Sequence, residues 1–259
     1  MSAAHGFALG DGVTAGQRAW YEQFGFIVFR GVLSPEEVET IRGEAEALER
    51  RTLAGELPPS DVDDLTPPSR DEAGNARLHR LPYFTRYCPG AREIVHQPRI
   101  ASLARLVADD AWMLEDTLHG AIWQLKRGGK GSRYSEIRWH IDFEDDHVLS
   151  PVVSAGIYLD ESTVRNGCLA VVPMSHRYPP RKLPPVPLLV EARPGDVVCH
   201  AHNVYHGSGP VLAGAPSRAT LYLYFCGGEY PGPDLPFAPP EHRSRVRRLF
   251  VGAGERGTA

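Results

Sequence analysis

Two side chains that commonly bind metal ions, His140 and Asp142, lie two residues apart in the sequence. If this segment is a β-strand, its period of two directs both side chains to the same face of the sheet. A third histidine would complete the set of two histidines and one carboxylate that holds ferrous iron and leaves coordination positions open. The candidates are His200, His202 and His206. We favour His206, which ends a strand-like segment and opens a Gly-Ser-Gly-Pro turn.

An isolated His-x-Asp pair is a weak signal, because so short a motif arises by chance in many proteins. The segments around it strengthen the prediction. The motifs that accompany the pair are Phe24-Gly-Phe-Ile-Val-Phe, Leu33-Ser-Pro-Glu-Glu-Val, the run from Asn166 to His176, Pro194-Gly-Asp196, Ser208 and Arg218. In this order they resemble the phytanoyl-CoA dioxygenase (PhyH) family of iron(II)/2-oxoglutarate oxygenases, and the resemblance covers residues 17–226.

The resemblance implies a fold, a metal and a cosubstrate. The fold would be a double-stranded β-helix, the jelly-roll or cupin-like barrel of that superfamily. The ligands of Fe(II) would be His140, Asp142 and His206, and the reaction would consume 2-oxoglutarate and O2. Because related halogenases have a small residue at the position of Asp142, the carboxylate here implies hydroxylation, desaturation or oxidative ring closure.

Three further residues match cosubstrate contacts of the family. The resemblance assigns Arg218 to the far carboxylate of 2-oxoglutarate, Ser208 to the same carboxylate, and Gln124 to a polar contact on an earlier strand. The type of residue at position 218 suits this role, because a guanidinium presents a planar fork of donors that matches a carboxylate.

The residues around the metal pair are most similar to ectoine hydroxylases, which share the pattern Trp-His-x-Asp-Phe-Glu-x-x-His. Asp146 departs from it, because those enzymes have an aromatic residue there. An aromatic wall would suit a cyclic cation, whereas an acidic wall suits hydroxyls or an amine. The candidate substrate contacts are Glu144, Asp146, His147, Tyr222 and Trp123. Instead of contacting substrate, Glu144, Asp146 and His147 could belong to a solvated loop, and Tyr222 and Trp123 could pack in the core.

These residues indicate an enzyme that oxidises an unactivated C–H bond of a polar small molecule. The chain also resembles tailoring oxygenases of bacterial antibiotic pathways, including those that close orthoester or methylenedioxy rings on oligosaccharides. We therefore predict hydroxylation or ring closure on a saccharide natural product. The alternatives are a hydroxylase of a free amino acid or ectoine-like osmolyte, and a non-catalytic jelly-roll module that keeps a metal structurally.

The elements that must position these side chains are mainly strands, with helices before them. Turn signals separate short strand-like runs, which favours a sandwich or double-sheet jelly roll with a helical N-terminal layer. We expect one domain over residues 1–259, with a lid-like loop at about 51–77. The expected helices lie in residues 14–50, after Pro98 and around 243–250. The expected strands are 26–29, 121–126, 137–143, 152–159, 168–173, 188–191, 197–200 and 219–225.

Composition excludes several classes of protein. The net charge of −4 and pI of about 6.3 argue against a nucleic-acid partner. No apolar run is long enough to span a membrane, and the first residues lack a signal-peptide pattern, so we expect a cytoplasmic protein. The four cysteines are scattered, which predicts idle thiols. Lys126, Arg127 and Arg138 lie near the metal strand, and we expect them to face water.

Overall fold

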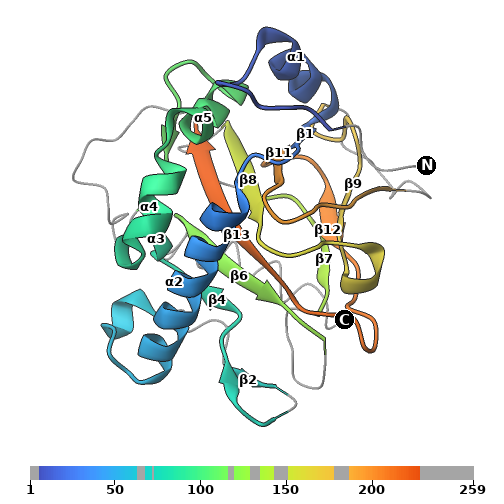
Figure 1. Cartoon of the computed structure of the whole chain (residues 1–259). Helices are drawn as coiled ribbons and strands as arrows, with labels where there is room; N and C mark the ends of the chain where they lie inside the picture. Colours follow the sequence, from blue (N-terminus) through green and yellow to red (C-terminus); the bar gives the residue numbers. More distant parts are fainter. Residues whose placement is uncertain are drawn as a thin grey trace.

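The fold consists of two antiparallel β-sheets that face each other, with helices on the outer side of the larger sheet (Figure 1). It is a computed structural model, in which residues 6–62, 68–71, 73–115, 120–128, 135–142, 151–177 and 187–227 are described. Apolar side chains from both sheets, such as Val28 and Val171, form a common core between them. This arrangement confirms the predicted jelly roll with a helical N-terminal layer.

Two sheets supply the walls of the barrel, and both are antiparallel throughout. The larger has the order β1-β11-β8-β13-β6-β4, with β5 paired to β13. Its strands are β1 (Phe26–Phe29), β4 (Arg80–Leu81), β5 (Trp112–Met113), β6 (Ile122–Lys126), β8 (Val152–Tyr158), β11 (Val197–Ala201) and β13 (Arg218–Cys226). The smaller has the order β10-β9-β12-β7. Its strands are β7 (Ile137–His140), β9 (Leu169–Val171), β10 (Leu188–Val190) and β12 (His206–Ser208).

The helices pack on the outer face of the larger sheet, seen beside β13 in Figure 1. The helical segments are α1 (Ala15–Phe24), α2 (Pro35–Leu53), α3 (Phe84–Tyr87), α4 (Pro89–Val95) and α5 (Pro98–Ala101), with 3₁₀ turns at η1 (Pro59–Asp61), η2 (Ser102–Leu106) and η3 (Val164–Asn166). The two longest helices begin with capping boxes, in which Thr14 and Ser34 bond the backbone of the third helical residue. Each box satisfies amide groups that have no partner inside the helix.

The alternation along β13 divides its side chains between the two faces of the sheet. Leu221 and Leu223 belong to the core shared with the helices. Arg218, Thr220 and Tyr222 therefore point the other way, into the barrel. The same alternation along β6 and β8 decides which residues line the interior.

Two expected elements differ from the structure. The helix after Pro98 has only four α-helical residues and continues as 3₁₀ turns in η2. Ser102 starts that change, since its Oγ bonds the Arg99 carbonyl oxygen at 2.6 Å, a local bond that competes with regular helix. The expected loop at 51–77 contains the end of α2, η1 and a hairpin of β2 (Ser69–Arg70) and β3 (Ala76–Arg77). The C-terminal helix expected around 243–250 lies outside the described residues.

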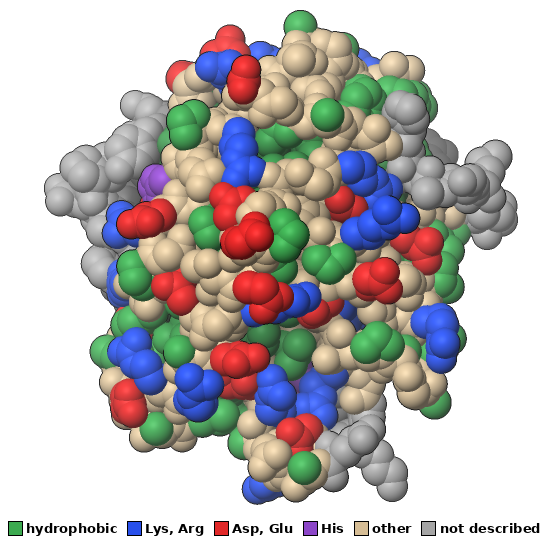
Figure 2. Space-filling model, viewed as in Figure 1, with side chains coloured by type: hydrophobic (Ala, Val, Ile, Leu, Met, Phe, Trp, Pro, Cys, Tyr) green, Lys and Arg blue, Asp and Glu red, His purple; other side chains and the backbone are tan. Residues whose placement is uncertain are grey.

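The surface shown in Figure 2 carries both signs of charge. Acidic and basic side chains alternate there with apolar ones, and no large area has a single sign. None of the helices in the described residues has the length and hydrophobicity needed to cross a membrane. All four cysteines are buried and form no disulfide, which agrees with the expectation of scattered, buried thiols.

Candidate active site

Three predicted metal ligands converge inside the barrel. His140 ends β7, Asp142 follows two residues later, and His206 begins β12 directly opposite His140 in the strand register. One ligand atom from each lies within 4.8 Å of the other two. The Asp142 Oδ1 atom is 3.4 Å from His140 Nε2 and 3.8 Å from His206 Nε2. The three side chains thus form a compact face of two imidazoles and one carboxylate.

Backbone carbonyls fix the orientation of both imidazoles. The Nδ1 atom of His140 lies 2.7 Å from the Arg138 carbonyl oxygen, and that of His206 lies 2.9 Å from the Val204 oxygen. A carbonyl can only accept a hydrogen bond, so each Nδ1 carries a proton, and in the neutral imidazole Nε2 then has the lone pair. Both lone pairs are then available to a metal, the arrangement usual for metal-binding histidines.

The electrostatics around Asp142 and His206 favour the forms of these two groups that bind metal. Burial alone would raise the pKa of Asp142, but the neighbouring His206, His140 and His200 outweigh it and hold the pKa below its usual range. Burial, together with His200 and His140, lowers the pKa of His206 well below its usual value. An ionised carboxylate and a neutral imidazole are the states that coordinate a cation.

The two remaining histidines of this region support the ligands from β11 and its end. The ring of His200 is buried and lies 4.2 Å from the ring of His206. The His202 carbonyl oxygen accepts a 2.7 Å hydrogen bond from the Asp142 amide. The sequence offered both histidines as alternatives to His206 for the third ligand, whereas the structure places both in contact with residues of the candidate ligand set.

Two residues expected to bind 2-oxoglutarate, Arg218 and Ser208, contact each other, and Ser208 lies two residues after the candidate metal ligand His206. Arg218 is 3% exposed, and its guanidinium donates to Thr220 Oγ1 at 3.1 Å, to the Gly167 carbonyl at 2.9 Å and to Ser208 Oγ at 3.3 Å. Among the described residues, its buried Nε finds no hydrogen-bond partner. A buried guanidinium with an unpartnered donor fits an anionic group such as a carboxylate.

Gln124 lies on the same inner face as these residues. It sits in β6 directly opposite Thr220 of β13 and Arg80 of β4. Its side chain is half-buried. This position is compatible with the predicted polar contact to the cosubstrate.

The expectation that Lys126 faces water is wrong. The residue ends β6 and is 2% exposed, and its ammonium lies beside Ser208 and the turn at Gly167. Its burial follows from the alternation of β6, which directs Gln124 and Lys126 to the same inner face. Arg138, by contrast, is exposed as expected.

The candidate substrate contacts have different outcomes. Tyr222 is half-buried on the inner face, where its ring lies against Gly156; a Cβ at Gly156 would come within 3.1 Å of Tyr222 Cε1. Trp123 does not line the barrel. It is 5% exposed and belongs to the core between the larger sheet and the helices, because it alternates with Gln124. The remaining three, Glu144, Asp146 and His147, lie outside the described residues.

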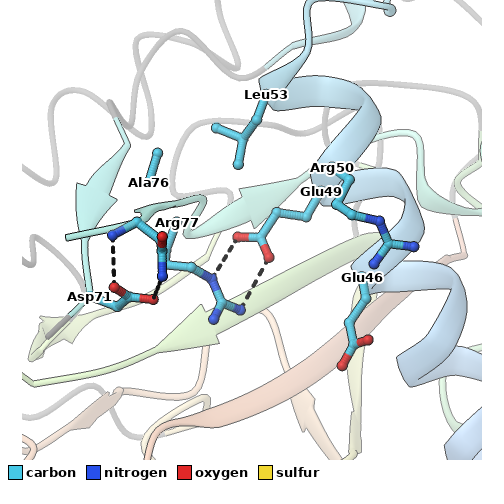
Figure 3. Close-up of a pocket in the computed structure, with 8 residues that line it drawn as sticks. Glu46, Glu49, Arg50, Leu53, Asp71, Ala76 and Arg77 are labelled. Carbon is cyan, nitrogen blue, oxygen red and sulfur yellow. Dashed lines mark hydrogen bonds and ion pairs between the residues drawn. The ribbon is translucent and has the colours of Figure 1, made fainter. Parts of the chain in front are cut away.

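A surface hollow outside the barrel lies between α2 and the β2–β3 hairpin (Figure 3). Glu49 and Arg77 face each other across it, with an ion pair of 3.1 Å. Asp71 accepts a 2.8 Å hydrogen bond from the Asn75 backbone and so closes the hairpin turn. These charges already have partners, and the hollow holds none of the predicted site residues.

Comparison with known proteins agrees with this description. The family described as Phytanoyl-CoA dioxygenase (PhyH) matches residues 21–220. Among curated relatives, an ectoine dioxygenase of Bordetella bronchiseptica is 28% identical over 176 residues, which are 64% of this chain and 51% of the relative. The chain therefore spans about half the length of the curated relatives it matches.

Solved structures share the fold over most of the chain. AviO1 from Streptomyces viridochromogenes is 26% identical with a TM-score of 0.62, and the match covers 84% of this chain and 96% of that one. EctD from S. alaskensis, solved with 2-oxoglutarate and 5-hydroxyectoine, is 25% identical with a TM-score of 0.62, covering 86% and 79% of the two chains.

Proposed function

The chain belongs to the phytanoyl-CoA dioxygenase (PhyH) family, and from this premise we propose that it is an iron(II)- and 2-oxoglutarate-dependent oxygenase. Its reaction would oxidise an unactivated C–H bond of a polar small molecule. His140, Asp142 and His206 would hold the iron, and Arg218, Ser208 and Gln124 would hold the cosubstrate.

One observation carries this proposal: the candidate metal ligand His206 and Ser208, which contacts the buried Arg218 of β13, lie on the same strand. His206 and Ser208 share the inner face of β12, and two residues along a strand span about 7 Å. Arg218 contacts Ser208 at that distance from the metal ligand. A short diacid that chelates a metal through one end can reach Arg218 and Ser208 with the carboxylate at its other end.

The chain's own residues would bind the iron and the cosubstrate, orient the metal ligands and shield the site from water. When bound, iron and 2-oxoglutarate would supply the oxidation by O2. The backbone bonds to the two Nδ1 atoms would keep both imidazoles aimed at the metal. The barrel walls around Val171 and Tyr158 would exclude bulk water, which protects a reactive centre from side reactions.

For the substrate we propose a saccharide natural product of the kind modified in antibiotic pathways, by hydroxylation or by orthoester or methylenedioxy ring closure. The sequence supports this choice through Glu144, Asp145 and Asp146, which directly follow the metal strand. Carboxylates accept hydrogen bonds from sugar hydroxyls and pair with amino groups.

The second candidate is hydroxylation of an ectoine-like osmolyte. It is favoured by the relatives, of which several are named ectoine dioxygenases with 28–30% identity. Asp146 counts against it, because ectoine hydroxylases have an aromatic residue there.

The test is succinate formation from 2-oxoglutarate with Fe(II) and O2, in the presence of single compounds. Aminoglycosides and oligosaccharides form one panel, and ectoine with free amino acids forms the other. Stimulation by the first panel alone would support the saccharide substrate, and stimulation by the second alone would overturn it. An enzyme that yields no oxygen-dependent succinate, with or without these compounds, would favour a non-catalytic metal-binding module.

A further inference from the structure

A wall of apolar and aromatic side chains lines one end of the barrel interior. It is built by β13 and by the segments of β5, β6 and β8 that pair with it; the residues of β13 that alternate with it, Leu221, Leu223 and Phe225, belong instead to the core under the helices. Trp112 and Tyr222 are half-buried in this wall, whereas its other members, Leu114, Ile122, Val152, Tyr224 and Cys226, are buried. Trp112 and Tyr222 are therefore its most accessible members.

The strand register gives the length of this wall. Tyr222 lies opposite Ile122 of β6, and Trp112 of β5 lies opposite Cys226. Tyr222 and Cys226 are four residues apart on β13, and four residues of a strand span about 13 Å. The arrowhead of β13, which marks the Trp112 end of the wall, lies beside α5 in Figure 1. The two accessible aromatic residues therefore stand at opposite ends of the wall.

The wall adjoins the candidate metal site. The amide of Val152, one of its members, donates to His202 Nδ1 at 3.2 Å. The His202 carbonyl oxygen in turn accepts a 2.7 Å hydrogen bond from the Asp142 amide. Burial, followed by the nearby Asp142 carboxylate, raises the pKa of Tyr224. A substrate held beside Asp142 would therefore have this wall next to it, with Trp112 at the far end.

The chemistry of the wall suits the faces of rings. None of its seven described members carries a charge, and its two accessible members are aromatic. A sugar ring presents C–H groups on its faces and hydroxyl or amino groups at its edge, so its face can pack on the electron-rich face of an aromatic side chain. A single six-membered ring, with bonds of about 1.5 Å, is much shorter than the wall. Two linked rings match its length better.

We propose that Trp112 forms a second substrate subsite at the end of the barrel: it packs on a ring that is linked to the ring held beside the metal, so the substrate contains at least two rings. The inference rests on the proposed function and narrows its substrate class to saccharides of two or more rings. It disfavours ectoine, which is a single small ring.

The test measures how the effect of Trp112 depends on the number of rings in the substrate. Two series of probes have one, two and three rings: 2-deoxystreptamine, neamine and ribostamycin, and methyl glucoside, maltose and maltotriose. Ectoine is tested beside them, and oxygen-dependent succinate formation gives kcat/KM for each compound. The variant is Trp112→Leu, which keeps an apolar side chain without the aromatic face. Trp20→Leu is the matched control, because Trp20 is also half-buried but packs against Phe7 and Phe24.

We expect the wild-type protein to prefer compounds of two or three rings over the one-ring member of the same series. Trp112→Leu should lower kcat/KM for the longer compounds about 3- to 10-fold, the loss expected for one aromatic contact, and should leave one-ring compounds within about twofold. Trp20→Leu should leave every value unchanged. The 2-oxoglutarate absorption band of the iron-loaded protein should titrate equally in all three proteins.

Equal losses in Trp112→Leu for compounds of one ring and of several would overturn the inference, because a merely structural tryptophan would affect all substrates alike. An undiminished kcat/KM for the longer compounds in that variant would also overturn it, as would stimulation by ectoine or one-ring compounds alone. The same holds for a wild-type protein that forms the keto-acid band but responds to none of the compounds. A protein that gives neither the band nor succinate would instead reject the proposed function itself.

Labelling of the wild-type protein covers the case in which Trp112→Leu does not fold. Hydroxyl radicals oxidise accessible tryptophan side chains, and mass spectrometry measures the oxidation of the Trp112 and Trp20 peptides separately. A stimulating compound of two or three rings should reduce the labelling of Trp112, whereas the one-ring member of its series should not. The labelling of Trp20 should stay constant throughout. Equal labelling of Trp112 with and without the longer compound would contradict the second subsite.

Discussion

Replacing Arg218 by methionine removes the guanidinium that faces the expected cosubstrate while keeping a side chain of similar length. Arg218 is almost fully buried, and its Nε has no hydrogen-bond partner within the part of the chain that the structure describes. The contact with a bound carboxylate would therefore form in a desolvated place, where a charge-assisted hydrogen bond is strong. We expect 2-oxoglutarate binding to weaken severely in this variant.

The magnitude follows from the kind of contact. Truncating one partner of a buried, hydrogen-bonded charge pair costs about 2–5 kcal/mol. Lys126 remains beside the site, so we expect the lower part of this range, about 2–3.5 kcal/mol. At about 1.4 kcal/mol per tenfold change, the dissociation constant of 2-oxoglutarate should rise roughly 30- to 300-fold.

The assay is the dissociation constant of 2-oxoglutarate on the iron-loaded protein, together with its KM in succinate formation. Arg138→Met, an exposed arginine of β7, is the control and should leave both values unchanged. Arg218→Lys keeps the charge without the planar fork, so we expect it to recover only part of the binding. A change of less than threefold in Arg218→Met would refute the assignment of this residue to the cosubstrate.

Three further outcomes follow from the described contacts. Gly156→Ala places a Cβ 3.1 Å from the Tyr222 ring and should lower kcat/KM for the substrate about 10- to 100-fold; an unchanged value would remove Tyr222 from the proposed substrate wall. Trp123→Ala should lower the free energy of unfolding by about 3–5 kcal/mol in denaturant titrations, with the KM for 2-oxoglutarate unchanged, because this side chain lies in the core. Burial would raise the pKa of Glu37, but hydrogen bonds from Arg99, Ser34 and Gln97 lower it. The stabilisation by the ionised Glu37 carboxylate is therefore present at neutral pH and lost in acid. Glu37→Gln should unfold at a lower temperature than wild type at pH 7, and this difference should disappear below about pH 4. A stability difference between the two proteins that does not change with pH would contradict a contribution from the ionised Glu37 carboxylate.

The candidate metal ligands could be chosen from the sequence because their spacing is local or marked by a strong pattern. The pair His140 and Asp142 was recognisable from its spacing, although β7 ends at His140 and Asp142 follows it, and α2 was recognisable from the box at Ser34 and the apolar spacing after it. The partner strand could not be derived in the same way. β12 has only three residues and contains a glycine, so periodicity alone gives it no signal.

Lys126 shows what the sequence could not provide. Lysine is rarely buried, so exposure was the reasonable expectation. Its burial depends on a register that places Arg218, Ser208 and Gly167 around it, from segments 41 to 92 residues further along the chain. Trp123 was expected near the substrate but lies in the core. The sequence could not show this, because only the position of the helices distinguishes the outer face of β6 from the inner one.

The most direct test of the central claim is an anaerobic titration with ferrous iron and 2-oxoglutarate, followed by the visible charge-transfer band of a metal-chelated keto acid. The account predicts a saturable band in the wild-type protein and its loss in His140→Ala and Asp142→Ala, with both variants still folded by circular dichroism. A protein that binds iron but gives no band, or variants that keep the wild-type band, would contradict the assignment of the metal and cosubstrate site to this end of the barrel.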